Sequence, residues 1–216
     1  MEAGLESLAH AVIEGNRKGA VDMVRRLLDA GILPTRIIEE GLLAGMKVVG
    51  ERFTHCELYV PEVLLSGRTM KASLEALRPA LIPAGWEPVA TMVLGTVRGD
   101  LHDIGKNLVG VMLEGAGIRV VDIGVDAPAE KFVAAVREHR ARLVGISSLL
   151  TTTMENVPEV LRALESAALR EKVRVVVGGA PVTGEWATEI GADAYAPDAG
   201  SAGQVCRRLA EQMESA

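Results

Sequence analysis

The stretch "VATMVLGTVRGDLHDIGK", residues 89–106, joins an apolar run to a polar turn and then to an amphipathic segment. The run at residues 89–97 is short and rich in β-branched side chains, which is typical of a buried strand in a parallel sheet. A helix is expected to begin near Ile104. A strand that leads directly into a helix is the repeating unit of an α/β fold.

The same alternation of apolar runs and helical stretches recurs through the second half of the chain. Apolar runs occupy residues 118–124, 141–150 and 173–179, and helical stretches start near Ile104, Pro128, Met154 and Pro181. A short "ADAYA" at 192–196 and a final helix from about Ser201 complete five βα units. This alternation predicts a doubly wound, Rossmann-like, five-stranded parallel sheet.

The first 80 or so residues have helical periodicity and no convincing strand. Four helices are expected over residues 5–16, 20–31, 34–53 and 61–77, with Pro34 and Pro61 opening the last two. They predict a small four-helix bundle. Residues 78–88 contain three prolines and a glycine and look like a linker. We therefore expect a helical cap domain over 1–85 and an α/β domain over 86–216.

Composition excludes several classes of function. The formal net charge is −6 with no basic cluster, which argues against nucleic acid as a direct partner. No apolar run approaches the roughly 20 residues of a membrane span, and the N-terminus has no signal-peptide pattern. Two distant cysteines, Cys56 and Cys206, lack metal-ligand spacing and fit a reducing cytoplasm.

Three loops follow predicted strands: "GDLHDIGK" at 99–106, "SSLLTTT" at 147–153 and "GGAPVTG" at 178–184. In a doubly wound sheet, ligands bind at the carboxyl ends of the strands, near the point where the strand order reverses. We therefore expect the three loops to converge on one rim.

The first loop places His102 between two aspartates. Asp100 can accept a hydrogen bond from Nδ1–H and leave Nε2 to bind a metal, and Gly105 lets a planar group approach the backbone. Two alternatives stay open for this pattern alone. Asp100 or Asp103 could cap the helix that starts near Ile104, or His102 could belong to a catalytic dyad, although no nearby nucleophile supports that.

The other two loops offer hydroxyls and glycines. The hydroxyls of Ser147, Ser148 and Thr151–Thr153 can bind polar ligand atoms or extend a hydrogen-bond relay, and any one threonine could instead cap a helix. Gly178 and Gly179 could open a slot or form a tight turn. A dinucleotide site or P-loop is disfavoured, because neither glycine motif is present.

The order and spacing of these loops resemble a known family. Asp100-x-His102-x-x-Gly105 is followed after 41 residues by Ser147-x-Leu149, and Gly178–Gly179 comes 28 residues later. This pattern is similar to the cobalamin-binding domain of methionine synthase, the B12-dependent mutases and the corrinoid proteins of methyltransferase systems. Residues 46–77 also resemble the helical cap of methionine synthase and methyltransferase corrinoid proteins. The chain thus looks like a stand-alone corrinoid protein of the methylamine, methanol or methoxyarene type.

The resemblance implies a site for cobalamin or a related corrinoid. His102 would be the lower ligand of cobalt, and Asp100 would hold its other nitrogen. Thr153, where methionine synthase has a serine, would extend the relay. The remaining implied cofactor-binding residues are Asp103 and Gly105 in the histidine loop, Ser147, Leu149, Gly178 and Gly179 around a slot for the nucleotide tail, and Phe53 and Val60 in the cap. Phe53 and Val60 could equally be bundle core.

The resemblance also implies a methyl carrier. A substrate-specific methyltransferase would load the methyl group, an acceptor methyltransferase would pass it to tetrahydrofolate or coenzyme M, and a reductive activator would complete the partners. The chain would be a subunit of an enzyme system more than a self-sufficient catalyst. One alternative is a cobalamin-sensing regulatory module, although such sensors usually add a DNA-binding region. Another is a Rossmann-like protein without a corrin, in which His102 is only a loop residue.

Overall fold

The computed structural model describes residues 2–84 and 87–214. The chain divides into two compact units, one formed by Met1–Glu87 with Glu114–Ala116 and the other by Pro88–Leu113 with Gly117–Ala216. Within the described ranges, no helix combines the length and the apolar character needed to cross a membrane.

The helical unit contains the four helical segments that the periodicity predicts. Their bounds are α1 Glu2–Ile13, α2 Arg17–Asp29, then α3 Pro34–Arg36, η1 Ile37–Leu43 and α4 Ala44–Thr54 in one unbroken run, and finally α5 Val60–Ala84. Pro34 is the first residue of α3, as expected for a proline that opens a helix. The middle of the long run, η1, has π-helical hydrogen bonding.

Close contact between α1 and η1 depends on a small residue. A Cβ added at Gly41 would lie 2.7 Å from Cδ2 of Leu8, which is fully buried. Leu8, Val24, Ile38 and Met70 come from different helices and are each 2% exposed or less. The apolar stripes of the sequence therefore form one bundle core.

Helix α5 corrects the predicted linker. The helix continues to Ala84, so the linker prediction is wrong for residues 78–84, and residues 85–86 lie outside the described residues. The reason is burial: Leu77 is 0% exposed and Leu81 is 8% exposed, whereas Pro79 lies on the exposed face between them. Apolar packing at a helical spacing therefore overrides the helix-breaking tendency of proline.

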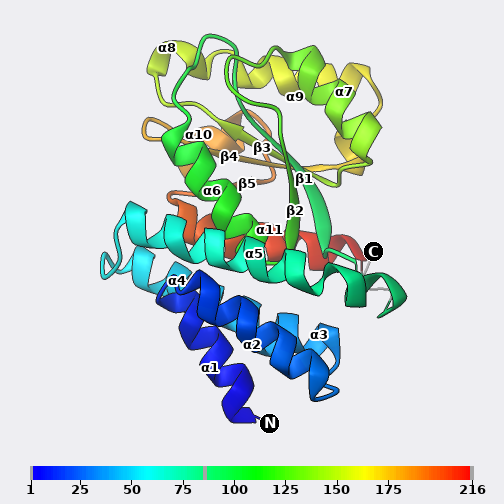
Figure 1. The fold of residues 1–216 in the computed structure, drawn as a ribbon. Helices are drawn as coiled ribbons and strands as arrows, with labels where there is room; N and C mark the ends of the chain where they lie inside the picture. The colour runs from blue at the N-terminus through cyan, green and yellow to red at the C-terminus, as the bar shows by residue number, and fades with distance from the viewer. Residues whose placement is uncertain (1, 85–86, 215–216) are drawn as a thin grey trace. The chain divides into compact units, whose positions relative to one another are not determined.

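The second unit is built on five parallel strands (Figure 1). They are β1 Ala90–Thr96, β2 Ile118–Asp122, β3 Leu143–Ser147, β4 Arg174–Gly178 and β5 Ala194–Tyr195. Their order in the sheet is β2-β1-β3-β4-β5. The order therefore reverses between β1 and β3, and the carboxyl ends of these two strands are where this fold binds ligands.

Helices connect the strands as the alternation predicts, with two differences. The helices are α6 Ile104–Gly115, α7 Ala129–His139, α8 Thr151–Met154, α9 Val157–Ser166, the 3-10 turn η2 Arg170–Lys172, α10 Gly184–Glu189 and α11 Ala199–Glu214. The helix expected near Met154 is split into α8 and α9. The one expected near Pro181 begins at Gly184, because Thr183 accepts a hydrogen bond from Trp186 N–H and caps it.

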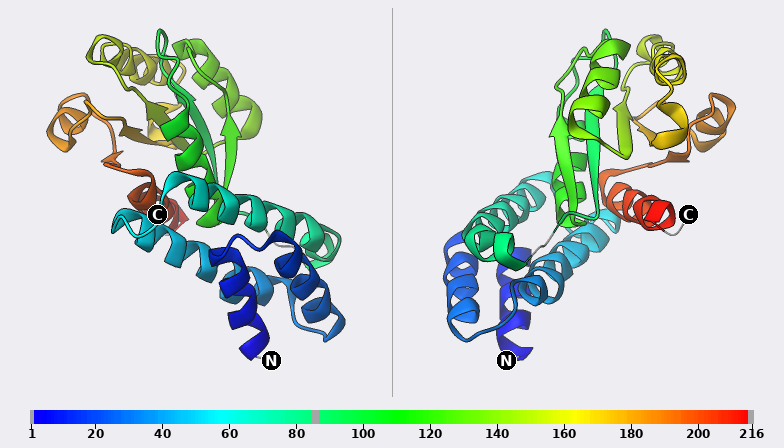
Figure 2. Two further views of the ribbon diagram at one scale, coloured as in Figure 1. Left: turned by 60° about the vertical axis from the view of Figure 1, so that its left-hand side comes forward. Right: turned by 90° about the vertical axis from the view of Figure 1, so that its right-hand side faces the viewer.

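Both faces of the sheet are covered. Figure 2 shows α7 and α9 side by side on one face, where Phe132 and Leu161 pack against the valines of the central strands. Helix α6 covers the other face, and a Cβ added at its Gly110 would lie 3.6 Å from Leu94. The two faces of the sheet are thus buried by helices. A ligand can therefore reach the strands only at their ends, where the loops lie.

Candidate functional site

The histidine loop begins with a tight turn directly after β1. Asp100 N–H donates to the carbonyl oxygen of Val97 at 3.0 Å, and Gly99 has φ +81°, which is the geometry of a type II turn. Glycine suits position 99 because a residue without a Cβ adopts a positive φ at little cost. The turn brings Asp100 into the interior, where its residue exposure is 0%.

The buried carboxylate of Asp100 accepts four hydrogen bonds. Oδ1 accepts from the backbone N–H of His102 at 3.0 Å and from its ring Nδ1 at 2.9 Å. Oδ2 accepts from Leu149 N–H at 2.6 Å and from the Thr153 hydroxyl at 2.9 Å. Burial alone would raise the pKa of Asp100, but these hydrogen bonds outweigh it and hold the pKa below its ordinary value.

This carboxylate decides the orientation of His102. An ionised carboxylate only accepts hydrogen bonds, so Nδ1 carries the proton and the lone pair of Nε2 is left available. The side chain of His102 is 48% exposed. Among the described residues, no three His, Cys, Asp or Glu side chains gather in a way that could hold a metal ion.

The helix-capping alternative does not account for Asp100. Its carboxylate contacts groups in its own loop and in the loop after β3, and none of its four donors belongs to α6. Asp103 is the residue that directly precedes α6, and its Oδ2 accepts from the side-chain amide of Asn107 at 3.1 Å.

A hydroxyl network continues from the carboxylate. Thr153 Oγ1 lies 2.9 Å from Ser148 Oγ, and both residues are buried. Because Thr153 can donate its one hydrogen to Asp100, its oxygen can accept from Ser148. None of the threonines in α8 serves as a capping acceptor, since its N-cap is Leu150 without a side-chain cap. The sequence pattern offered Ser148 only as one of several hydroxyls, although Ser148 is fully buried and the neighbouring Ser147 is not.

Ser147 and the paired glycines line the neighbouring strand ends. Ser147 ends β3 opposite Gly178 in the register, and both are half-buried. A Cβ at Gly179, which has φ +129°, would lie 1.8 Å from the carbonyl oxygen of Ser148, and one at Gly178 would lie 2.9 Å from that of Ala196. Close contact with neighbouring backbones is therefore one direct reason for glycine at both positions.

The surface around His102 is apolar. Leu101 is 70% exposed and Ile104 is 73% exposed on either side of it, and Leu149 and Leu150 are about 40% exposed on the adjacent loop. A Cβ added at Gly105 would meet nothing within 4 Å. Exposed large apolar side chains that lie close together are typical of an interaction or ligand-binding surface.

An ion pair between a buried lysine and a partly exposed aspartate holds the first turn of α6. Lys106 is only 2% exposed, and its Nζ lies 2.5 Å from Oδ2 of Asp122 at the end of β2 and 2.8 Å from Oδ1 of Asn107. A buried ammonium is tolerated only with such partners. The contact ties the helix that follows His102 to the adjacent strand.

The two residues implied for the cap lie in the helical unit. Phe53 is near the end of α4, Val60 is the first residue of α5, and both are half-buried. Glu62 accepts from Tyr59 N–H at 2.7 Å and so fixes the start of α5 beside Val60. A role for Phe53 and Val60 above a corrin stays a prediction.

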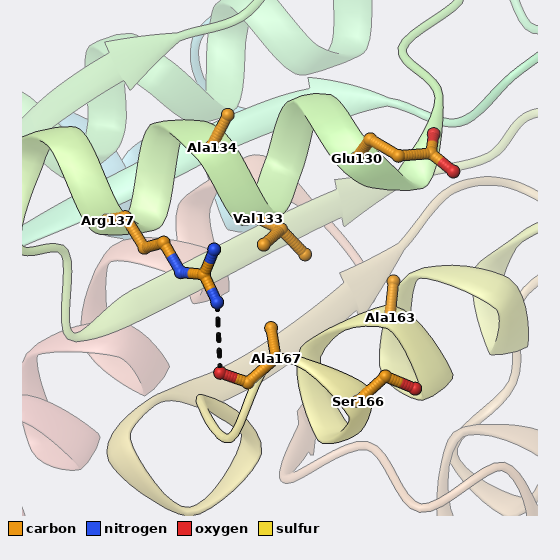
Figure 3. A pocket seen from close by; sticks show the side chains of 7 residues that line it. All are labelled: Glu130, Val133, Ala134, Arg137, Ala163, Ser166 and Ala167. Atoms are coloured by element: carbon orange, nitrogen blue, oxygen red, sulfur yellow. Dashed lines mark hydrogen bonds between the residues drawn. The ribbon is translucent and has the colours of Figure 1, made fainter.

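A separate groove of about 440 Å³ lies between α7 and α9 (Figure 3). Its walls are mostly small or apolar, and Arg137 donates to the carbonyl oxygen of Ala167 across it at 3.2 Å. It contains none of the residues around His102. We interpret it as a gap between two helices that meet through small side chains.

Comparison with known families agrees with this geometry. Residues 90–203 match a family model described as "B12 binding domain", and residues 5–78 match a second model with the same description. The first match includes all of the strand-end loops described above, and the second covers most of the helical unit.

Individual relatives span nearly the whole chain. The chain is 42% identical to dimethylamine corrinoid protein 1 of Methanosarcina mazei over 203 residues, 92% of each chain. Among solved structures, a cobalamin-binding protein from Desulfitobacterium hafniense superposes with a TM-score of 0.80 at 32% identity, covering 94% of this chain and 97% of the other. The methanol:cobalamin methyltransferase complex MtaBC from Methanosarcina barkeri gives 0.86 at 28% identity, covering 97% of this chain and 80% of the other.

Proposed function

The chain belongs to the B12-binding corrinoid proteins of methyltransferase systems, and on that premise we propose that it carries a methyl group on cobalt from a methylated donor to an acceptor such as tetrahydrofolate or coenzyme M. Methylamines are the first donors to test, because a relative at 42% identity is named a dimethylamine corrinoid protein. The observation that carries the proposal is the single imidazole, held by Asp100 with Nε2 available on an apolar surface.

The residues present fit a corrinoid better than a bare metal ion. One histidine cannot hold a metal ion by itself, whereas a corrinoid would bring most of the ligands of its cobalt with it, and His102 would supply one more. Leu101, Ile104 and the open space at Gly105 suit the face of such a ring. When bound, the corrinoid supplies a cobalt centre that takes up and releases a methyl group.

The side chains of the loop then have defined tasks. Asp100 keeps the proton on Nδ1 of His102 and so directs Nε2 outward. Thr153 and Leu149 N–H keep that carboxylate ionised and in place. Ser148 supports Thr153 from within the core. We propose that this chain of contacts sets how strongly His102 donates to the metal.

The other implied residues complete the proposal. Ser147, Leu149, Gly178 and Gly179 would border the nucleotide tail of the cofactor, supported by their position at the ends of β3 and β4. The helical unit would cover the upper face of the corrin through Phe53 and Val60. Donor and acceptor methyltransferases and a reductive activator would be the partners, in the cytoplasm, where the free thiols of Cys56 and Cys206 remain reduced.

Substitution of the ligand tests the cofactor part of the proposal. Purified protein reconstituted with cobalamin should show the optical spectrum of histidine ligation, and His102→Ala should lose that spectrum. The affinity for the cofactor should also fall, by about tenfold to a hundredfold, as it does when residues around other metal sites are changed. His139→Ala, which alters a histidine in the last turn of α7, is the matched control and should behave as wild type. An unchanged spectrum in His102→Ala would remove the ligand assignment.

Transfer of a labelled methyl group tests the carrier part. Reduced holoprotein is incubated with labelled methylamines, methanol or methoxyarenes and the corresponding methyltransferases. Label should appear in tetrahydrofolate or coenzyme M only when wild-type holoprotein is present. Retention of DNA by the holoprotein without any methyl transfer would instead support a cobalamin sensor.

A further inference from the structure

Asp126, a residue of the neighbouring loop, holds the turn that carries Asp100 and His102. It lies between β2 and α7 and has φ +50°, in the left-handed region. Few residues other than glycine occupy that region, and aspartate is one that tolerates it. Non-glycine residues in this conformation are often found at functional sites, so we asked what Asp126 contacts.

The hydrogen bonds of Asp126 go to the end of β1 and to the turn that follows it. Gly99 N–H donates to Asp126 Oδ1 at 2.6 Å. Asp126 N–H points to two acceptors, the carbonyl oxygen of Asp100 and the hydroxyl oxygen of Thr96, each at 3.0 Å. The Thr96 hydroxyl in turn donates to the carbonyl oxygen of Asp100 at 2.5 Å.

A second side chain holds the same turn from the other side. Asn156, between α8 and α9, donates its amide to the carbonyl oxygen of Arg98 at 2.8 Å. Arg98 C=O and Gly99 N–H are the two ends of one peptide group, so Asp126 and Asn156 hold that group at both ends. It is the central peptide of the turn, the group whose flip converts a type II turn into a type I turn.

We propose that Asp126 is a positioning residue for the lower ligand, acting through the Arg98–Gly99 peptide and the backbone of Asp100. This inference rests on the proposed function. The direction of the His102 ring depends on the Asp100 carboxylate, and that carboxylate is only as fixed as its backbone. Loss of the Oδ1 acceptor releases Gly99 N–H and leaves Asn156 as the remaining side chain that opposes a flip of the central peptide. Such a flip would move Asp100 relative to Leu149 and Thr153.

Three variants separate the hydrogen bond from backbone strain and from charge. Asp126→Gly keeps a backbone that accepts φ +50° but removes the acceptor. Asp126→Asn keeps both an acceptor oxygen and tolerance of the left-handed region but removes the charge. Arg140→Gly is the matched control, because Arg140 has φ +49° at the end of α7 and lies outside this loop cluster.

Two readouts are needed, one with cofactor and one without. In cobalamin-loaded protein, the nitrogen splitting in the electron paramagnetic resonance spectrum of Co(II) reports His102 ligation, and dilution gives the cofactor release rate. In cofactor-free protein, ¹H–¹⁵N correlations of the His102 ring report which nitrogen carries the proton, at an alkaline pH where imidazole is neutral.

We expect Asp126→Gly to show a mixture of ligated and unligated cobalt, to release cofactor about tenfold faster, and to lose the preference for a proton on Nδ1. Asp126→Asn and Arg140→Gly should match wild type in both readouts. Wild-type ligation and ring protonation in Asp126→Gly would overturn the proposal, as would an Asp126→Asn protein that behaves like Asp126→Gly. If wild type itself shows no histidine ligation, the proposed function fails, and the ring protonation of the cofactor-free variants still decides the role of Asp126.

Discussion

The two units of the chain bury polar side chains in different ways. In the α/β unit, Asp100, Ser148 and Thr153 are each at most 5% exposed and are joined to one another by hydrogen bonds. In the helical unit, Thr69 and Ser73 of α5 are fully buried, and within the described residues their hydroxyls have no hydrogen-bond partner. In the α/β unit, hydrogen bonds offset the free-energy cost of removing the polar groups from water, and the network holds the imidazole of His102 in place. In the helical unit, no hydrogen bond among the described residues offsets that cost.

Two glycines, one from each unit, differ in what surrounds them. Gly179 in the α/β unit lies against the backbone of Ser148, whereas Gly41 in the helical unit lies against the flexible end of Leu8. At Gly179 the close neighbour is a backbone carbonyl, whereas at Gly41 it is the end of an apolar side chain. A position packed in the second way tolerates substitution better.

The largest effect is expected at the glycines. Gly179→Ala puts a Cβ 1.8 Å from a carbonyl oxygen at φ +129°, so we expect a loss of about 3 kcal/mol or more in the free energy of unfolding. Gly41→Ala meets a side-chain methyl that can move, and should cost about 1 kcal/mol. Urea denaturation of both variants measures the difference. Equal losses would show that Leu8 cannot move aside and that the two positions are equally constrained.

Asp100 should give the next largest effect. Asp100→Asn places an amide where the carboxylate accepts from Leu149 N–H and Thr153, so two donors face each other. We expect a loss of about 2–3 kcal/mol near neutral pH, as for a buried donor left unsatisfied. Asp29→Asn, an exposed change in α2, is the control and should cost less than about 0.5 kcal/mol.

Acid should close the gap between wild type and Asp100→Asn. The pKa of Asp100 is lowered in the folded protein, so the unfolded chain binds the proton more readily, with a pKa of about 3.9. The stabilising contribution of the carboxylate is therefore complete above that value and is lost as the pH falls through the lower folded pKa. Denaturation curves from about pH 7 down to about pH 3 measure this. A gap that stays constant over the range would contradict the hydrogen-bonded carboxylate.

How much of this could be predicted depends on how local each contact is. The pairing of Asp100 with His102 spans two residues, and the spacing alone indicated it. The approach of Leu149, 49 residues away, followed from strand order, because the ends of β1 and β3 meet at one rim. The role of Thr153 came from the family resemblance, and the hydrogen bond to Asp100 agrees with it.

Contacts that depend on loop backbones were not predictable. Strand β3 ends at Ser147, and the change in backbone direction after it buries Ser148 rather than Ser147. The periodicity of the sequence does not predict such a change. Asp126 reaches Gly99 only because its own backbone is left-handed. The sequence also failed to predict that α5 continues past residue 77. Its prolines indicated a linker, whereas tertiary packing buries Leu77 and Leu81 and keeps the segment helical.

The smallest effects come from one substitution made in both units. Thr153→Val removes a hydroxyl that serves both Asp100 and Ser148, so we expect a loss of about 1–2 kcal/mol in the free energy of unfolding. Thr69→Val removes a buried hydroxyl without a hydrogen-bond partner among the described residues, and should be neutral or stabilising by up to about 1 kcal/mol. Both changes keep the size and the β-branched shape, so only the hydrogen bonding differs. Paired urea titrations should therefore give values of opposite sign or clearly different size. A loss at Thr69 as large as that at Thr153 would mean that the α5 hydroxyl is satisfied in solution, and the contrast between the two units would not hold.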